Sequence, residues 1–101
     1  MTENGFTTRE PGVFEVSGQM TFQTVPRFLA HTDKLLQNSA STVTIDMHDV
    51  TLADSAGLAL MIEWLQLARA AKHEIVFTNI PEQMRDLIRV NGLQKVFQLP
   101  A

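Results

Sequence analysis

Two kinds of hydrophobic pattern alternate along this chain, and the alternation restricts the fold more than any other feature. Residues 42–47 (TVTIDM) place polar and apolar side chains in strict turn, which is the period of a half-buried strand. Residues 24–38 instead repeat apolar side chains at the three- and four-residue spacing of a helix, with Thr24 as a candidate N-cap. Strands that alternate with helices predict a mainly parallel sheet with helices packed on it.

The remaining segments extend this alternation. Val13–Val16 predicts a short strand, and Gln19–Phe22 is expected to pair with it as a hairpin across Gly18. After a loop at His48–Asp54, the sequence predicts a helix from Ser55 to Lys72, a strand at Glu74–Thr78, a third helix opened by Asn79–Glu82 and ended by Gly92, and a short strand at Val96–Leu99.

The predicted order is therefore β-β-α-β-α-β-α-β. It describes one α/β domain with a mainly parallel sheet of four to five strands and three main helices. The total of 101 residues is the length of a single domain. Residues 1–10 are polar and aperiodic, so we expect a flexible N-terminus followed by the domain at 11–101.

Composition excludes several classes of function. The net charge is −3 with scattered Lys and Arg, which argues against nucleic-acid binding. The absence of cysteine excludes disulfides and thiolate metal sites. The start of the chain lacks a signal-peptide pattern, and the longest uncharged apolar stretch, Ala56–Ile62, is too short to span a bilayer, so a cytoplasmic protein is expected.

The junction between the third predicted strand and the second helix is the most informative segment. Asp54 or Ser55 would cap the helix, and Ala56 and Gly57 are small enough to permit close approach to its first turn. In parallel sheets, binding sites lie at this carboxyl edge, and a helix start favours an anion, including a phosphate attached to Ser55. The alternative, that Asp54 and Ser55 form only a cap, stays open.

The second helix carries two apolar stripes where a helix on one sheet needs one. The first suits the core and comprises Leu58, Met61, Ile62, Leu65 and Ala68. The second comprises Leu60, Trp64, Leu67 and Ala71. Either a neighbouring helix covers the second stripe, or part of it stays exposed as a docking patch anchored by Trp64.

The sequence gives little support for catalysis or metal binding. The segment around Ser55 lacks the first Gly of a nucleophile elbow, and His48 has no marked orienting partner. His31 and His73 have no evident reason to reach Ser55. Asp46, Asp49 and Asp54 could be taken as metal ligands, but such acids are more often caps or solvated loop residues. No phosphate-binding loop is present. We therefore expect no catalytic residue, cofactor, metal or small-molecule substrate.

Three segments in this order resemble the STAS domain: Ile45–Met47, Asp54–Leu58 and the stretch from Asn79 to Leu93. That is the fold of anti-sigma-factor antagonists and of the cytosolic tails of some anion transporters. The resemblance covers nearly the whole chain beyond residue 10. It implies a domain that works by binding another protein.

Within the family, Ser55–Leu60 and Glu63–Arg69 are most similar to the MlaB-type STAS subunit of phospholipid-transport ABC systems in Gram-negative bacteria. The resemblance implies a non-catalytic cytoplasmic subunit that binds and supports the transporter's ATPase in a system maintaining outer-membrane lipid asymmetry. It would reach the inner membrane only through that partner. The expected partner-binding residues are Asp54, Ser55, Ala56, Leu60 and Trp64.

Ser55 also matches the position that anti-sigma-factor antagonists phosphorylate, so a phosphorylation-regulated antagonist is the alternative. Those proteins usually read Asp-Ser-Ser-Gly or Asp-Ser-Thr-Gly, whereas Ala56 stands third here. This departure, together with the run Trp64–Arg69, favours the transport interpretation.

Overall fold

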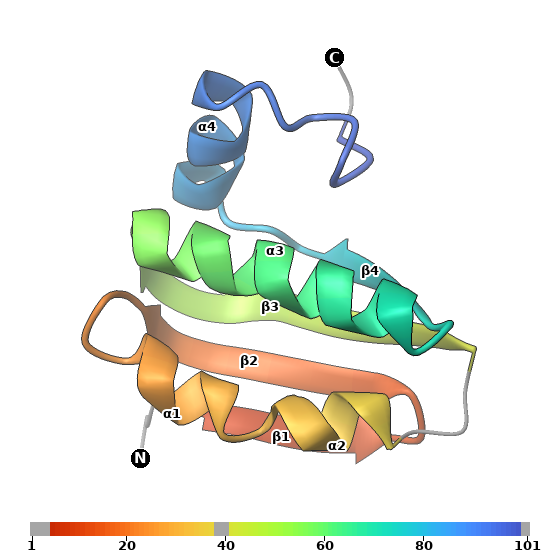
Figure 1. Ribbon diagram of the computed structural model, residues 1–101. Coiled ribbons are helices and arrows are strands. Elements are labelled where there is room, and N and C mark those ends of the chain that lie inside the picture. The colour runs from red at the N-terminus through yellow and green to blue at the C-terminus, as the bar shows by residue number, and fades with distance from the viewer. Residues whose placement is uncertain (1–4, 38–40, 100–101) are drawn as a thin grey trace.

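A single four-stranded sheet organises the molecule (Figure 1). The computed structural model describes residues 5–37 and 41–99. The strands lie in the order β1-β2-β3-β4, with β1 antiparallel to β2 and the other neighbours parallel. This confirms the predicted α/β fold. The elements are β1 Gly5–Glu10, β2 Val13–Met20, α1 Val25–Leu29, α2 Thr32–Leu36, β3 Thr42–Ala53, α3 Ser55–Ala70, β4 Glu74–Thr78 and α4 Glu82–Val90.

Helices α1, α2 and α3 lie across one face of the sheet (Figure 1). The core lies between this helical layer and the sheet, because the apolar side chains of the central strands point toward the helices. The largest side chains that are fully buried are Trp64, Phe28, Met20, Leu35, Ile45, Met47, Met61, Met84, Ile88, Val16 and Val43.

The first strand lies where the sequence predicts a flexible segment. Gly5–Glu10 pairs with β2, which runs unbroken through the predicted hairpin turn at Gly18. Phe6 explains the difference, since its buried ring lies 5.2 Å from the ring of Phe14 and 5.9 Å from that of Trp64. One apolar side chain among polar neighbours is too weak a pattern to predict a strand. Residues 1–4 lie outside the described residues.

The helix predicted over 24–38 is two short helices. Around the break, His31 donates its N–H to Phe28 O at 3.0 Å and accepts from Lys34 N at 3.0 Å, which are tight three-residue turns. The His31 ring stacks on Phe6 at 5.3 Å. Thr24 precedes α1 but does not cap it with its side chain, because its hydroxyl donates to Gln19 O at 2.6 Å. Residue 38 lies outside the described residues.

Strand β3 continues to Ala53, through the predicted loop at His48–Asp54. Two register shifts explain this, since β3 advances one residue more than β2 between Glu15 and Ser17 and again between Gly18 and Gln19. After Met47, the inward-facing side chains therefore recur every three residues instead of every two. The sequence pattern there no longer resembles that of a strand. The buried positions are Val43, Ile45, Met47, Val50 and Ala53.

The C-terminal segment forms turns, so the strand predicted at Val96–Leu99 is wrong. Phe97 is nevertheless buried, with its ring 5.7 Å from that of Phe77. One anchored aromatic residue gives the segment its apolar character without a ladder of backbone hydrogen bonds. Gly92 follows α4 with φ +69°, which confirms the predicted left-handed end of that helix.

Candidate functional site

Asp54 fixes the junction between β3 and α3. Its Oδ1 accepts from Ala56 N at 2.9 Å and from Gly57 N at 3.3 Å, so Asp54 is the N-cap of the helix. Its Oδ2 accepts from Phe22 N at 3.1 Å, which ties the β2–α1 loop to the same point. The cap interpretation therefore holds for Asp54. Because this carboxylate already satisfies two N–H groups, the helix start is not an open anion site.

Gly57 allows α3 to start against the end of β2. A Cβ at this position would collide with the backbone oxygen of Met20, and any shift would disturb the hydrogen bond that Asp54 N donates to it at 3.2 Å. Gly57 is buried and Ala56 is half-buried beside it. The small residues in this motif are thus needed for packing inside the domain.

Ser55 is the exposed member of the motif. Its hydroxyl has no hydrogen-bond partner among the residues that the structure describes. It lines a groove of about 380 Å³ together with Asp54, Gln83 and Val90. The first turn of α3 therefore presents a free hydroxyl to whatever contacts this end of the sheet.

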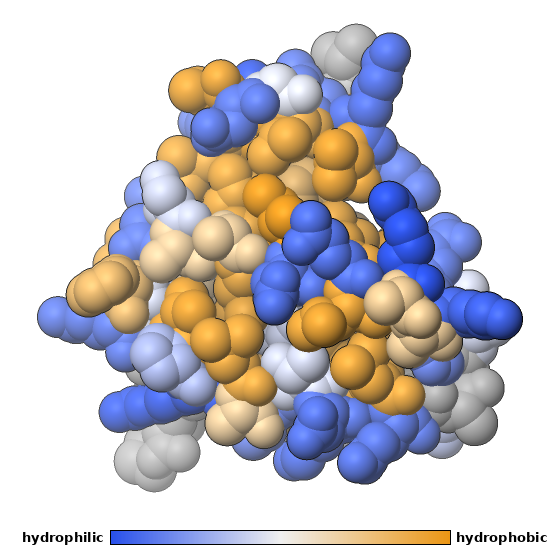
Figure 2. All heavy atoms as spheres, viewed as in Figure 1, coloured by the Kyte–Doolittle hydropathy of each residue, from blue (hydrophilic) through white to orange (hydrophobic). Residues whose placement is uncertain are grey.

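Two residues near the junction of β3 and α3 carry large, exposed apolar side chains. Phe22 is 80% exposed and Val90 is 84% exposed. Phe22 is tied to Asp54 through its backbone, and Val90 lines the Ser55 groove. We call Phe22, Ser55 and Val90 the Ser55 surface. Figure 2 shows hydrophobic residues across this helical side of the molecule, including the region between α3 and α4. These exposed apolar side chains and the free hydroxyl make the Ser55 surface the candidate site for contact with another protein.

Sequence analysis missed Phe22 and Val90. The sequence predicts a strand through Phe22, so the pattern does not predict its exposure in the β2–α1 loop. Val90 carried a usable signal, because it falls away from the apolar stripe of α4 formed by Met84 and Ile88. An apolar residue off the stripe of a short amphipathic helix marks a possible contact surface.

Trp64 and Leu60 lie inside the domain, which corrects the docking-patch interpretation of the second stripe. Trp64 is 1% exposed and Leu60 is 2% exposed. The indole Nε1 donates to Thr32 Oγ1 at 3.1 Å, and Phe6 packs against the ring. Leu60 and Trp64, in the first part of the second stripe, are therefore covered by neighbouring elements, whereas Leu67 is half-buried and Ala71 is exposed. Leu60 and Trp64 therefore do not lie on a free surface, which contradicts the docking-patch interpretation.

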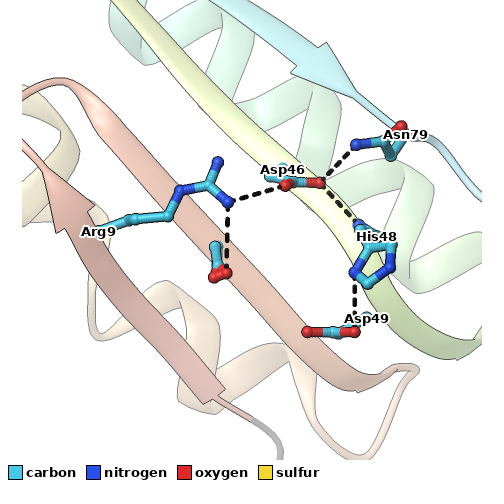
Figure 3. Close-up of polar contacts among 6 residues, drawn as sticks. Arg9, Asp46, His48, Asp49 and Asn79 are labelled. Carbon is cyan, nitrogen blue, oxygen red and sulfur yellow. Dashed lines mark hydrogen bonds and ion pairs between the residues drawn. The ribbon is translucent and has the colours of Figure 1, made fainter.

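A polar cluster on the sheet, separate from Ser55, centres on Asp46 (Figure 3). Its Oδ1 accepts from Asn79 Nδ2 at 3.0 Å and from His48 N at 2.9 Å, and its Oδ2 accepts from Arg9 Nη1 at 3.2 Å. Burial raises the pKa of Asp46, but the bonds from Asn79, His48 and Arg9 together outweigh it and hold the pKa below 3.8. Asp46 thus joins β1, β3 and the loop after β4.

Among the described residues, no acid or histidine side chain is hydrogen-bonded to the Ser55 hydroxyl. His48 Nδ1 lies 2.9 Å from Asp49 Oδ1, a pair that sequence analysis did not predict, but His48 lines a different groove from Ser55. Among the described residues, no cluster of three or more His, Asp or Glu side chains could hold a metal ion. Within the same residues, no helix is both long and apolar enough to cross a membrane.

The family model described as an Mlab STAS domain matches residues 7–100. The chain belongs to the MlaB-type STAS family. Proteins of this family are STAS domains, which mediate protein–protein interactions and are generally regulatory rather than catalytic. No curated protein matches the chain.

Solved structures place the MlaB-type chain in the STAS fold. An anti-sigma factor antagonist from Mycobacterium paratuberculosis matches with a TM-score of 0.73 and 22% identity, over 95% of this chain and 86% of that one. Unphosphorylated SpoIIAA, also an anti-sigma factor antagonist, matches with a TM-score of 0.71 and 16% identity, over 90% and 82%. Phosphorylated SpoIIAA from Bacillus matches with a TM-score of 0.67 and 17% identity, over 90% and 85%. At these identities the likeness establishes the fold alone.

Proposed function

We propose that this protein is a non-catalytic subunit that binds the ATPase of a phospholipid-transporting ABC complex. In this role it supports the assembly and activity of the ATPase, and the complex maintains the lipid asymmetry of the outer membrane. The protein is cytoplasmic and reaches the inner membrane only through its partner. The main support is the match to the MlaB-type family model over residues 7–100.

The Ser55 surface is the proposed contact with the ATPase. Its two apolar side chains, Phe22 and Val90, are exposed, and burying them against a partner removes apolar area from water. Ser55 adds a hydroxyl that can hydrogen-bond across the interface. Asp54 and Ala56 support this surface from below, through the helix cap, and contribute by holding Ser55 and Phe22 in place.

Co-purification with the ATPase subunit tests the proposal. Ser55→Trp places a bulky side chain in the middle of the surface, so we expect loss of co-purification with little change in melting temperature. Ser41→Trp is the matched control, because Ser41 is also exposed but precedes β3, at the opposite end of that strand. Retained binding by Ser55→Trp, or equal loss in both variants, contradicts the proposed contact.

An anti-sigma-factor antagonist regulated by phosphorylation of Ser55 is the second candidate. The observation in its favour is the exposed Ser55 hydroxyl without a partner in the described part of the chain. Mass spectrometry of the protein isolated from its own cells distinguishes the two functions. A phosphate on Ser55, together with capture of an anti-sigma factor instead of an ATPase, supports the second candidate.

A further inference from the structure

A second and larger groove lies on a different face of α4 from the Ser55 surface. It has a volume of about 530 Å³, within the range of small-molecule sites. Apolar side chains form part of its lining, and cationic or ionisable ones form the rest. The main lining residues are Phe77, Ile80, Leu99, His48, Arg85 and Arg89.

The charge of this groove opposes that of the whole molecule. The chain has a net charge of −3, yet two guanidinium groups line the groove against one carboxylate, that of Glu82. Arg85 has no side-chain partner among the described residues. Arg89 contacts Asp86 at 3.4 Å, and both side chains are exposed, so this pair is weak. Two arginines are thus available to an anion from outside.

One wall of the groove is held in place by the Asp46 cluster. Asn79 and the backbone of His48 both donate to Asp46 Oδ1, at 3.0 and 2.9 Å (Figure 3). Asn79 adopts a left-handed conformation with φ 53°, which turns the chain from β4 toward α4. Arg9 Nη1 lies 3.2 Å from Asp46 and 3.5 Å from Glu15, so it offsets part of the negative charge behind this wall. The wall is therefore preorganised, which lowers the entropic cost of binding.

We propose that this groove binds a small molecule that carries a phosphate group next to an apolar or aromatic group. Arg85 and Arg89 lie one helical turn apart, so both guanidinium groups can reach one phosphate, and arginine presents planar donors that match its oxygens. Phe77, Ile80 and Leu99 offer the apolar group a contact. The phosphate belongs either to a soluble phosphate ester or to a lipid headgroup. The proposal is independent of ATPase binding, because the Ser55 surface uses other residues.

Titration of the ¹⁵N-labelled full chain with phenyl phosphate, followed by NMR, tests the site. We expect saturable shifts in amides of residues 79–89, and binding about tenfold weaker for benzyl alcohol, which lacks the phosphate. Arg85→Ala combined with Arg89→Ala should weaken the binding of phenyl phosphate by about tenfold or more. The control Arg27→Ala removes an exposed arginine on α1 and should leave the affinity unchanged.

Two further titrations identify the source of the phosphate. Saturable shifts with phenyl phosphate and none with vesicles of phosphatidylglycerol assign the groove to soluble phosphate esters. Binding to those vesicles that the double arginine variant loses, with none to phosphatidylcholine vesicles, assigns it to an anionic headgroup. The proposal is overturned if phenyl phosphate produces no saturable shifts, or if the double variant and Arg27→Ala bind it equally.

Discussion

Gly57 shows how a single residue positions the candidate site. Ala at this position would press its Cβ against the backbone oxygen of Met20, so one of the two backbones would have to shift. We expect Gly57→Ala to lower the free energy of unfolding by about 1–3 kcal/mol. Urea denaturation measures the loss, with Ser55→Ala as the neighbouring control that changes stability by less than about 0.5 kcal/mol. Equal stability of the two variants would mean that the close approach does not exist.

Asp46 makes stability depend on pH. Its pKa in the folded protein lies below the ordinary value of 3.8, so its contribution is fully present above that value. As the pH falls through the lowered folded pKa, the carboxylate takes up a proton and this contribution is lost. We expect Asp46→Asn to be less stable at neutral pH and to lose less stability on acidification.

Urea unfolding at a series of pH values from about 7 down to about 2 checks this expectation. Asp49→Asn is the matched control, because the Asp49 side chain is 58% exposed and pairs only with His48 among the ion pairs described. An acid-induced loss of the same size in Asp46→Asn and in the unaltered protein would show that Asp46 does not carry the effect.

At the scale of elements, Trp64 holds α2 and β1 onto α3. It is 1% exposed, contacts Phe6 and donates to Thr32. Trp64→Ala should therefore cost about 3–5 kcal/mol of folding stability and sharply lower the melting temperature. Gln66→Ala, an exposed change on the same helix, should leave it nearly unchanged. A stable Trp64→Ala protein that fails only in partner binding would restore the docking-patch interpretation.

Elements with regular periodicity were predictable from the sequence. Strand β4 matches its predicted residues, and α3 begins at Ser55 as expected. The failures have local causes. The register shifts in β3 break the two-residue period of its second half. In β1, the single buried aromatic side chain of Phe6 packs the strand onto the core. Such tertiary contacts do not produce a periodic hydrophobic pattern in a single sequence.

The candidate site was predictable only in part, for the same reason. The Asp54–Gly57 motif is visible in the sequence because capping and small residues are local features. Whether Trp64 or Val90 reaches solvent depends on which elements fold over α3 and α4. The motif therefore indicates Ser55 as the proposed centre of the surface, whereas the exposure of Phe22 and Val90 follows only from the fold.

At the scale of the whole molecule, two sides of α4 are proposed to have separate roles. One borders the Ser55 surface and the other borders the arginine-lined groove. The central claim concerns the first: the ATPase subunit docks against Phe22, Ser55 and Val90. Phe22 is 80% exposed, so a replacement there can report on contact without disturbing the core.

Site-directed photo-crosslinking tests this claim most directly. The photoreactive residue p-benzoylphenylalanine is placed at Phe22 in one variant and at Val96 in another, and each is co-expressed with the ATPase subunit. Val96 is 47% exposed and lies by Leu65 and Ile75, away from the Ser55 surface. The account predicts a crosslink to the ATPase from position 22 and none from position 96. A crosslink from position 96 with none from position 22 would contradict it.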